Sequence, residues 1–375
     1  MKTPSLHQFL LLSIVFPLTS GAVAQLPVSA NSGTIVASGL NDPRGLTFGV
    51  DGTLYIAEAG TGGTTSTVGI CTQVLSIGPD SGGPSARISK LSPVGKLSVL
   101  STGLPSFVAK QGDIIGVADI AFLDGKLYAL IGGGGCSHGN PTQPNGIVKV
   151  NLNSGEWDYI TNLSLFYMEH PAAYPNAFDF EPDGVPYSMI AHNGRLFAIE
   201  PNHGTITATT PDGETRQIMD FSFHFGHVVP TSIVAHDNNL YIGNLGQFPI
   251  TSQWERVTTL SRDIGFFDTT LGLTEDPNKF RIAGSRAGLT TVVSLKFGPD
   301  GLLYALELSD TPGGFPNPGD GKVVRLNADG NIETVVTGLS LPGGMVFGPD
   351  RALYISNAGD LGPGKGQILR IEIPM

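Results

Sequence analysis

A short hairpin motif recurs six times along this chain, and it constrains the fold more than any other feature. In each copy an apolar strand runs into a tight turn, often Asp-Gly or Asn-Gly, and a Leu-aromatic pair begins the next strand. Such dipeptides favour hairpins because they tolerate the positive φ that a short turn between right-twisted strands requires. The copies are Asp51–Tyr55, Asp124–Tyr128, Asn193–Phe197, Asp237–Tyr241, Asp300–Tyr304 and Asp350–Tyr354. A unit repeated at intervals of tens of residues is typical of a propeller or a solenoid.

Most copies are followed by a glycine-rich insertion and then by a second hairpin. Four antiparallel strands per repeat make a propeller blade, so we expect an all-β, six-bladed β-propeller with strands A to D in each blade, A being innermost. The insertions between B and C and the connections from D to the next A then share one side, here called the long-loop face, where repeat folds place function. The second hairpins are predicted at Arg87–Leu91 with Leu97–Leu100, Gly146–Val150 with Trp157–Ile160, Thr205–Ala208 with Arg216–Met219, and Lys322–Leu326 with Glu333–Val336.

The fourth repeat is the least regular. Its second hairpin is expected within residues 257–267, followed by a long connection over residues 268–288. Residues 166–183 are similarly irregular. Both irregular segments are predicted to lie over the long-loop face.

The two ends of the chain suggest how the ring closes. The last repeat stops one strand short, after Gln367–Ile373, whereas Thr34–Leu40 resembles the fourth-strand segment Thr334–Leu339. We therefore expect the N-terminal strand to complete the last blade, which leaves no free sheet edge. Residues 25–375 are predicted to form a single domain.

Charge and hydropathy limit the classes of partner. The formal net charge is −11, only 14% of the residues are charged, and no run of Lys or Arg occurs. These features argue against a nucleic-acid or anionic-membrane surface. Beyond the N-terminus, no segment approaches the ~20 apolar residues of a membrane span. A monomer is expected.

Residues 1–24 have the pattern of a secretory signal. Lys2 gives a charged start, Phe9–Leu18 an apolar core, and Ala22-Val23-Ala24 a small-residue cleavage site. The mature protein is therefore predicted to be periplasmic or secreted.

The chain has two cysteines, Cys71 and Cys136, each in a glycine-rich loop after a Leu-Tyr strand of neighbouring repeats. In an oxidising compartment a disulfide between the two loops is the natural interpretation. The alternatives are two unpaired thiols or a zinc site that includes His138, although no Cys-x-x-Cys pair supports the latter.

Several segments resemble the ScyD/ScyE family of exported bacterial proteins, relatives of the NHL-type and TolB-like six-bladed propellers. The matching residues are Asn41–Phe48, Tyr55–Gly60, Val229–Ser232, Leu240–Leu245, Phe248-Pro249, Phe297–Tyr304 and Tyr354–Asn357. The resemblance covers essentially the whole mature chain. It implies a propeller fold and a link to maturation of an exported secondary metabolite.

Polar side chains at the ends of the six B strands are expected to face the long-loop side near the central channel. Carboxylate and amide oxygens are ligands that Ca²⁺ prefers, so a divalent cation is the predicted cofactor. The alternative is that these side chains cap loop amides. The predicted ligands are Glu58, Glu200, Asn244, Glu307 and Asn357.

Three further residues are candidates for ligand binding. Asp119, on the innermost strand of the second blade, is expected to line the channel. His203 and His227 fall in long-face segments, where an imidazole can act as acid, base or metal ligand. The alternative for both histidines is a solvent-exposed loop position.

These features favour a non-catalytic module that binds a small molecule or an envelope protein on the long-loop face. Aromatic and proline residues in the loops suggest an apolar rim there. The alternative function is a metal-assisted lactonase or esterase that uses the predicted cation site. The rim residues are Phe248, Pro249, Trp254, Phe315 and Pro316.

Overall fold

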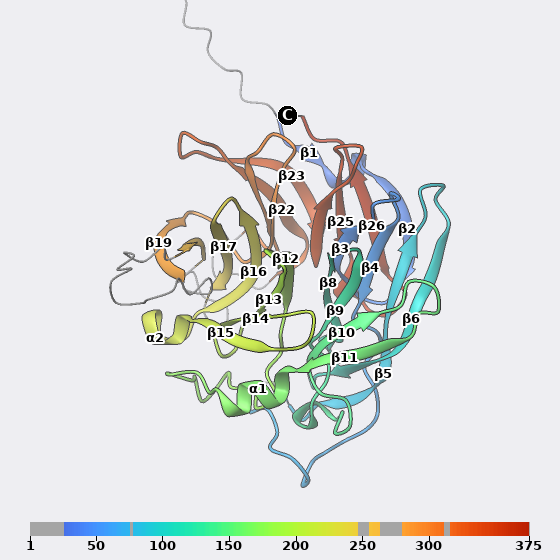
Figure 1. The fold of residues 1–375 in the computed structure, drawn as a ribbon. Coiled ribbons are helices and arrows are strands. Elements are labelled where there is room, and N and C mark those ends of the chain that lie inside the picture. Colours follow the sequence, from blue (N-terminus) through green and yellow to red (C-terminus); the bar gives the residue numbers. More distant parts are fainter. Residues whose placement is uncertain (1–25, 76–77, 247–254, 263–279, 311–315, 375) are drawn as a thin grey trace, which may run out of the picture.

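The computed structural model describes residues 26–75, 78–246, 255–262, 280–310 and 316–374. Its strands form six antiparallel sheets arranged around a central axis (Figure 1). The prediction of a six-bladed β-propeller is confirmed. Among the described residues no helix is long and apolar enough to cross a membrane.

The first three blades follow the chain in order. The first contains β3 (Pro43–Phe48), β4 (Leu54–Glu58), β5 (Ser81–Leu91) and β6 (Leu97–Val108), extended by β7 (Ile114–Ile115). The second contains β8 (Val117–Leu123), β9 (Lys126–Ile131), β10 (Gly146–Val150) and β11 (Trp157–Asn162). The third contains β12 (Ser188–His192), β13 (Arg195–Glu200), β14 (Thr205–Thr209) and β15 (Thr215–Asp220).

The last three blades include both N-terminal strands. The fourth contains β16 (Val229–His236), β17 (Asn239–Gly246), β18 (Arg256–Arg262) and β19 (Phe280–Ala287). The fifth contains β20 (Val292–Phe297), β21 (Leu303–Glu307), β22 (Pro318–Leu326) and β23 (Ile332–Ser340), with β1 (Val28–Ser29) on its outer edge. The sixth contains β24 (Gly344–Phe347), β25 (Leu353–Asn357), β26 (Gly366–Ile371) and β2 (Thr34–Leu40).

Short helices lie in the connections. Helices α1 (Leu163–Glu169) and α2 (Phe221–Phe225) follow the outermost strands of the second and third blades. Each is capped by the last residue of that strand: Asn162 accepts from the Leu165 amide and Asp220 from the Phe223 amide. Three 3₁₀ turns span Ala30–Ser32 (η1), Cys136–His138 (η2) and Gly359–Leu361 (η3).

The recurring hairpins form the inner two strands of every blade. At Asp124-Gly125 and Asn193-Gly194 both turn residues have positive φ, between 47° and 72°. This is the twist that a two-residue hairpin needs, and it explains why Asp-Gly and Asn-Gly occur there. The hairpin predictions are confirmed.

The aromatic residue of each motif packs between blades rather than within one. Four of these rings contact, edge to face, a phenylalanine on the innermost strand of the next blade, with ring centroids 5.0–5.3 Å apart. Buried apolar clusters lie at all six blade interfaces. The repeated motif therefore supplies both a turn and an interblade contact. The four pairs are Tyr55–Phe122, Tyr241–Phe297, Tyr304–Phe347 and Tyr354–Phe48.

Ring closure follows the predicted route. Strand β2 pairs antiparallel with β26, and the two lie side by side in Figure 1. Innermost strands β24 and β3 also contact each other, so the sixth blade packs against the first. An additional strand that the sequence did not indicate, β1, pairs in parallel with β23 of the fifth blade.

One prediction is wrong in the fourth blade. Its outermost strand, β19, lies at Phe280–Ala287, inside the segment that was expected to be a connection. Most of its residues are exposed or half-buried, and it carries two arginines and a glycine. An edge strand with little buried apolar surface gives no strong alternation, which is why the pattern missed it.

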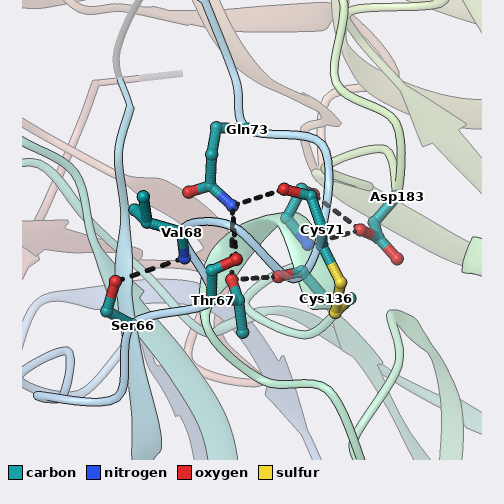
Figure 2. Close-up of a disulfide and its surroundings, with 8 residues drawn as sticks. Ser66, Thr67, Val68, Cys71, Gln73, Cys136 and Asp183 are labelled. Atoms are coloured by element: carbon teal, nitrogen blue, oxygen red, sulfur yellow. Dashed lines mark hydrogen bonds between the residues drawn. A yellow bond between two sulfur atoms is a disulfide. The ribbon is translucent and has the colours of Figure 1, made fainter.

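The predicted disulfide between Cys71 and Cys136 is present, with Cα atoms 6.0 Å apart. It joins the B–C insertions of the first two blades (Figure 2). The Thr67 hydroxyl donates to the Cys136 carbonyl at 2.6 Å, and Gln73 Nε2 donates to the Cys71 carbonyl at 3.0 Å. The bridge is thus part of a hydrogen-bonded loop pair on the long-loop face.

Reduction of this disulfide is expected to destabilise the protein by about 4 kcal/mol, because the bridge closes a loop of 65 residues in the unfolded chain. Urea unfolding with and without reductant measures the difference. A Cys71→Ser/Cys136→Ser variant is the control, and its free energy of unfolding is expected to be the same with and without reductant. Two free thiols in the intact mass of labelled, non-reduced protein would rule the bridge out.

Candidate functional site on the long-loop face

The predicted cation ligands lie at the ends of B strands, and each of them makes hydrogen bonds to nearby protein groups. Four of them accept a hydrogen bond from a backbone amide that precedes strand A; three of these amides lie in the connection, and the fourth belongs to Ser340, the last residue of β23. The bonds are Asn41 N to Glu58 Oε2 at 2.6 Å, Val185 N to Glu200 Oε1 at 2.8 Å, Thr290 N to Glu307 Oε1 at 2.9 Å and Ser340 N to Asn357 Oδ1 at 2.8 Å. In these four blades the polar residue therefore ties the segment before strand A to the end of strand B.

Two of these carboxylates also have a basic partner. Arg87 Nη2 lies 2.7 Å from Glu58 Oε2, and Lys322 Nζ lies 3.1 Å from Glu307 Oε2. Burial raises the pKa of Glu307, and Lys322 opposes that shift. The negative charge that a metal ion would use is already balanced by a protein cation.

Asn244 is the only predicted cation ligand with a buried oxygen, Oδ1, that has no hydrogen-bond partner in the described part of the chain. Its Nδ2 donates to the Arg256 carbonyl at 3.2 Å. Among the described residues no three His, Cys, Asp or Glu side chains are grouped so that they could hold a metal ion. The structure therefore does not bring the predicted ligands together as a shared Ca²⁺ site among the described residues.

Asp119 lines a narrow cavity on the axis, as expected from its place on the innermost strand. Its Oδ2 accepts from the Met189 amide at 2.8 Å and from the Ser188 hydroxyl at 3.2 Å. Burial raises the pKa of Asp119, and the positive charge of Lys296, on the same cavity, opposes the shift. Because the cavity measures only about 10 Å³, it has room for roughly one water. A ligand role for Asp119 stays a prediction.

A buried ion pair lies in the connection that enters the first blade. Arg44 Nη2 is 2.7 Å from Asp42 Oδ2 and also donates to the Ile114 carbonyl at 2.9 Å. Burial raises the pKa of Asp42 to about 6, although Arg44 lowers it. The Ser356 hydroxyl donates to the Arg44 carbonyl at 2.6 Å. The Ile114 contact joins the innermost strand of the first blade to β7 of the same sheet, and the Ser356 contact joins it to the sixth blade.

His203 is not a solvent-exposed loop residue. Its side chain is buried, its Nε2 lies 2.8 Å from the Glu181 carbonyl oxygen, and its ring stacks on Phe180 with centroids 4.9 Å apart. Its backbone amide donates to Glu200 Oε2. The structure therefore places His203 in the interior, where it supports the segment around Glu181.

His227 lies two residues before innermost strand β16 and faces a carboxylate that the sequence did not single out. His227 Nε2 is 2.9 Å from Asp179 Oδ2, and the two side chains are 11% and 6% exposed. Asn202 Nδ2 donates to the other carboxylate oxygen, Asp179 Oδ1, at 3.1 Å. Burial raises the pKa of Asp179, whereas His227 lowers it. The 2.9 Å contact is an ion-pair distance, and neither His227 Nε2 nor Asp179 Oδ2 makes a hydrogen bond to the described residues. His227 Nδ1 makes no hydrogen bond to the described residues.

A larger buried network, missed from the sequence, continues from this pair. His138 lies between two acceptors: Nδ1 is 2.6 Å from the Gly134 carbonyl oxygen and Nε2 is 2.7 Å from Glu181 Oε2. Since both nitrogens face acceptors, both carry protons, and the pKa of His138 is about 9. Burial alone would lower that pKa; Glu181 raises it. The Phe107 ring stacks on the imidazole at 4.4 Å.

The one sequence feature that could have pointed to this network is a set of acidic residues at alternate positions in an irregular segment: Asp179, Glu181 and Asp183. All three side chains are buried. Asp183 Oδ2 accepts from the amide and the hydroxyl of Ser137, next to the disulfide (Figure 2). Alternating acids in a loop suggest solvent exposure, and only the tertiary structure shows their partners.

No protein-family profile and no curated protein match this chain. Solved structures with the same fold are numerous. A candidate oxidoreductase (glucose dehydrogenase) from Thermus thermophilus has a TM-score of 0.54 and 17% identity, covering 91% of this chain and 99% of its own. Regucalcin, a calcium-binding protein from Agrobacterium tumefaciens, has a TM-score of 0.52 and 14% identity, covering 91% and 94%. A candidate gluconolactonase has the same TM-score and identity, covering 91% and 92%.

The chain is similar to these propellers in fold. At this level of identity the likeness does not transfer an activity, because the three proteins carry different descriptions on one architecture. The resemblance to the ScyD/ScyE family stays a prediction.

Proposed function

We propose that this protein is a hydrolase of the ester or lactone class, with the Asp179–His227 pair as its general base. The observation that carries the proposal is the 2.9 Å approach of His227 Nε2 to the buried Asp179 carboxylate. A carboxylate on one imidazole nitrogen keeps a proton there and leaves a lone pair on the other nitrogen. In this protein the other nitrogen is Nδ1, which is not bonded to the described residues.

The reaction follows from that tautomer. His227 Nδ1 takes a proton from water, and the water oxygen attacks the substrate carbonyl carbon. The tetrahedral intermediate then collapses, its carbon–oxygen bond to the leaving group breaks, and the imidazolium returns the proton to the departing alkoxide. A lactone gives a hydroxy acid, and an ester gives an acid and an alcohol. Asp179 stabilises the imidazolium and fixes the ring orientation.

The fold likeness adds support from analogy only. One propeller of similar fold is a candidate gluconolactonase, and hydrolysis of a lactone is the reaction class that this description implies for that protein. The hydrolase proposed here differs from the metal-assisted alternative in its residues. It uses His227 and Asp179 instead of Glu58, Asn244, Glu307 and Asn357.

Replacing His227 with Gln is expected to lower kcat/KM by about 10²–10⁴-fold, because a positioned general base contributes about that factor. Asp179→Asn is expected to give a comparable loss. The measurement is hydrolysis of a panel of lactones and aryl esters by the purified mature protein. His224→Gln is the matched control, since His224 is an exposed histidine in α2, three residues away.

Two results would count against this proposal. One is an equal loss of activity in His224→Gln and His227→Gln. The other is a wild-type protein that hydrolyses no member of the panel although its melting transition is intact.

The second candidate function is non-catalytic binding of a flat apolar ligand or an envelope partner. The observation that favours it is a group of exposed aromatic rings close in sequence to Asp179 and His227. The side chains of Tyr174, Phe178 and Phe223 are 55–62% exposed. Tyr174 stacks on Phe223 with centroids 6.3 Å apart. Ligand binding that Phe223→Ala weakens and His227→Gln leaves unchanged would favour this function. Of the apolar rim expected from the sequence, Phe248, Pro249, Trp254 and Phe315 lie outside the described residues.

Export as a monomer, with cleavage near Ala24, remains part of the proposal. The Cys71–Cys136 disulfide supports an oxidising compartment. The signal segment itself lies outside the described residues. A role in maturation of an exported secondary metabolite rests on the ScyD/ScyE resemblance alone.

A further inference from the structure

A cavity of about 230 Å³ lies between the fourth and fifth blades, on the face opposite the long-loop face. Its walls are mostly apolar and come from strands β17, β18 and β19 on one side and from the fifth blade, including its A–B and C–D turns, on the other. Gly301 and Ala328, in these turns, are exposed, so the cavity is open to solvent. Because the Asp179–His227 pair belongs to long-loop segments, this cavity is separate from the site of the proposed function.

The cavity exists because a side chain that is long in the fifth and sixth blades is short in the fourth. In the fifth blade the motif tyrosine, Tyr304, lies opposite Arg325 on the next strand, and Arg325 Nη1 is 3.4 Å from the Tyr304 hydroxyl. The sixth blade has the same pairing of tyrosine with arginine. In the fourth blade the residue opposite Tyr241 is Thr259, and both line the cavity. Threonine therefore leaves open the space that arginine fills in the other two blades.

The same difference leaves two hydroxyls of the cavity wall available. The Tyr304 hydroxyl donates to Asp300, the acidic residue of its own turn, at 2.8 Å. The corresponding acid of the fourth blade, Asp237, is exposed and accepts no such bond. Neither the Tyr241 hydroxyl nor the Thr259 hydroxyl makes a hydrogen bond to the described residues. Both are thus free to bond to a ligand.

Arg286, on β19, adds a positive charge to the cavity wall. Its guanidinium donates to the Gly330 carbonyl and, at 3.5 Å, to the Asn327 carbonyl, and it forms no ion pair with the described residues. Asp329, in the same turn of the fifth blade, accepts from Asn331 instead. A guanidinium has five N–H donors, so three remain unused. Apolar walls with a few convergent polar groups are typical of small-molecule sites, and an uncompensated guanidinium selects a carboxylate.

We propose that this cavity binds a small aromatic carboxylate, with its carboxylate on Arg286 and its ring beside the rings of Tyr241 and Phe297. The size fits, because a cavity of about 150 Å³ takes benzene. The 230 Å³ measured here has room for one ring and a short acid chain. Binding at this site requires no activity on the long-loop face.

The test is a ligand-observed NMR titration of the purified mature protein with phenylacetate and with phenylacetamide, which has the same ring and no charge. Phenylacetate is expected to bind at least about tenfold more tightly. Arg286→Gln is expected to raise the Kd for phenylacetate about ten- to hundredfold and to leave the affinity for phenylacetamide unchanged. Thr259→Arg, which introduces the side chain of the fifth blade, is expected to abolish binding of both. Arg281→Gln is the matched control, since Arg281 is an exposed arginine on the same strand and does not line the cavity.

Four results would overturn the proposal. The first is a wild-type protein that does not bind phenylacetate at millimolar concentration, and the second is equal affinity for the acid and its amide. The third is an equal loss of affinity in Arg281→Gln and Arg286→Gln, which would indicate a diffuse effect of charge. The fourth is binding that Phe223→Ala weakens and Arg286→Gln leaves unchanged, which would place the ligand on the long-loop face. If Thr259→Arg fails to fold, wild type and Arg286→Gln with the two ligands still decide.

Discussion

A chain that lacks residues 26–40 is expected to lose its cooperative unfolding transition. Without β2, strand β26 becomes a free edge, and the buried contacts of Leu40 and Ala37 in the seam between the sixth and first blades disappear. The loss approaches the whole stability of a typical domain, about 5–15 kcal/mol. Thermal unfolding monitored by circular dichroism and size-exclusion chromatography measures it.

A shorter truncation separates the closing strand from the segment before it. A chain that begins at Gly33 lacks β1 and η1 but keeps β2 paired with β26. We expect it to unfold cooperatively at a somewhat lower temperature, since it loses the parallel pairing with β23 and the packing of Val28 and Ala30 but keeps the closing strand. Identical melting curves for the two truncations would contradict the closure argument.

His138→Gln is expected to destabilise the protein by about 3–5 kcal/mol, because it leaves the buried Glu181 carboxylate without its cation. In a double-mutant cycle, His138→Gln with Glu181→Gln should cost less than the sum of the single changes. His236→Gln is the control: its pair with Asp237 is 3.6 Å long and exposed, and such pairs contribute less than about 1 kcal/mol. Urea unfolding in chelator gives the free energies.

The same pair predicts a pH dependence. The pKa of His138 is about 9 in the folded protein, above the value of about 6.5 for an unperturbed histidine. Its contribution to stability is therefore full below about pH 6.5 and is lost as the pH rises through 9, by about 3 kcal/mol. Burial raises the pKa of Asp80 from 3.8 to about 7. Stability is therefore also expected to fall as the pH rises through that range. In chelator, His138→Gln should lack the alkaline part of this slope; a parallel slope would contradict the assignment.

The sequence was sufficient for the fold because the hairpin motif is local. Asp-Gly and Asn-Gly set the turn, and Tyr55 or Tyr304 then marks the interblade contact through its spacing from that turn. Thr34–Leu40 could likewise be recognised from its own residues, because they match the pattern of an outermost strand, and it pairs with β26 as predicted. By contrast, β19 carries little apolar alternation, and the two-residue β1 is too short to give any periodic signal.

The candidate site could be predicted only in part. His227 was recognisable as a long-face histidine, but its partner Asp179 comes from a different loop, so no spacing connects them. The prediction for Glu58 and Glu307 identified a repeated polar position, and its capping alternative is what the structure shows. Whether a carboxylate binds an ion or a backbone amide depends on what folds next to it.

The pairing of β2 with β26 also dictates an order of assembly. The seam joins segments so distant that Gly364 donates to Asn41 across 323 residues. Bringing such ends together costs about 5 kcal/mol of chain entropy. The inner strands of the first five blades can pair with nearby residues. Strand β2, near the N-terminus, stays unpaired until β26 at the C-terminal end is available. Ring closure is therefore expected to be the last and slowest folding step, and the interval before it is when the exposed edge is most open to aggregation.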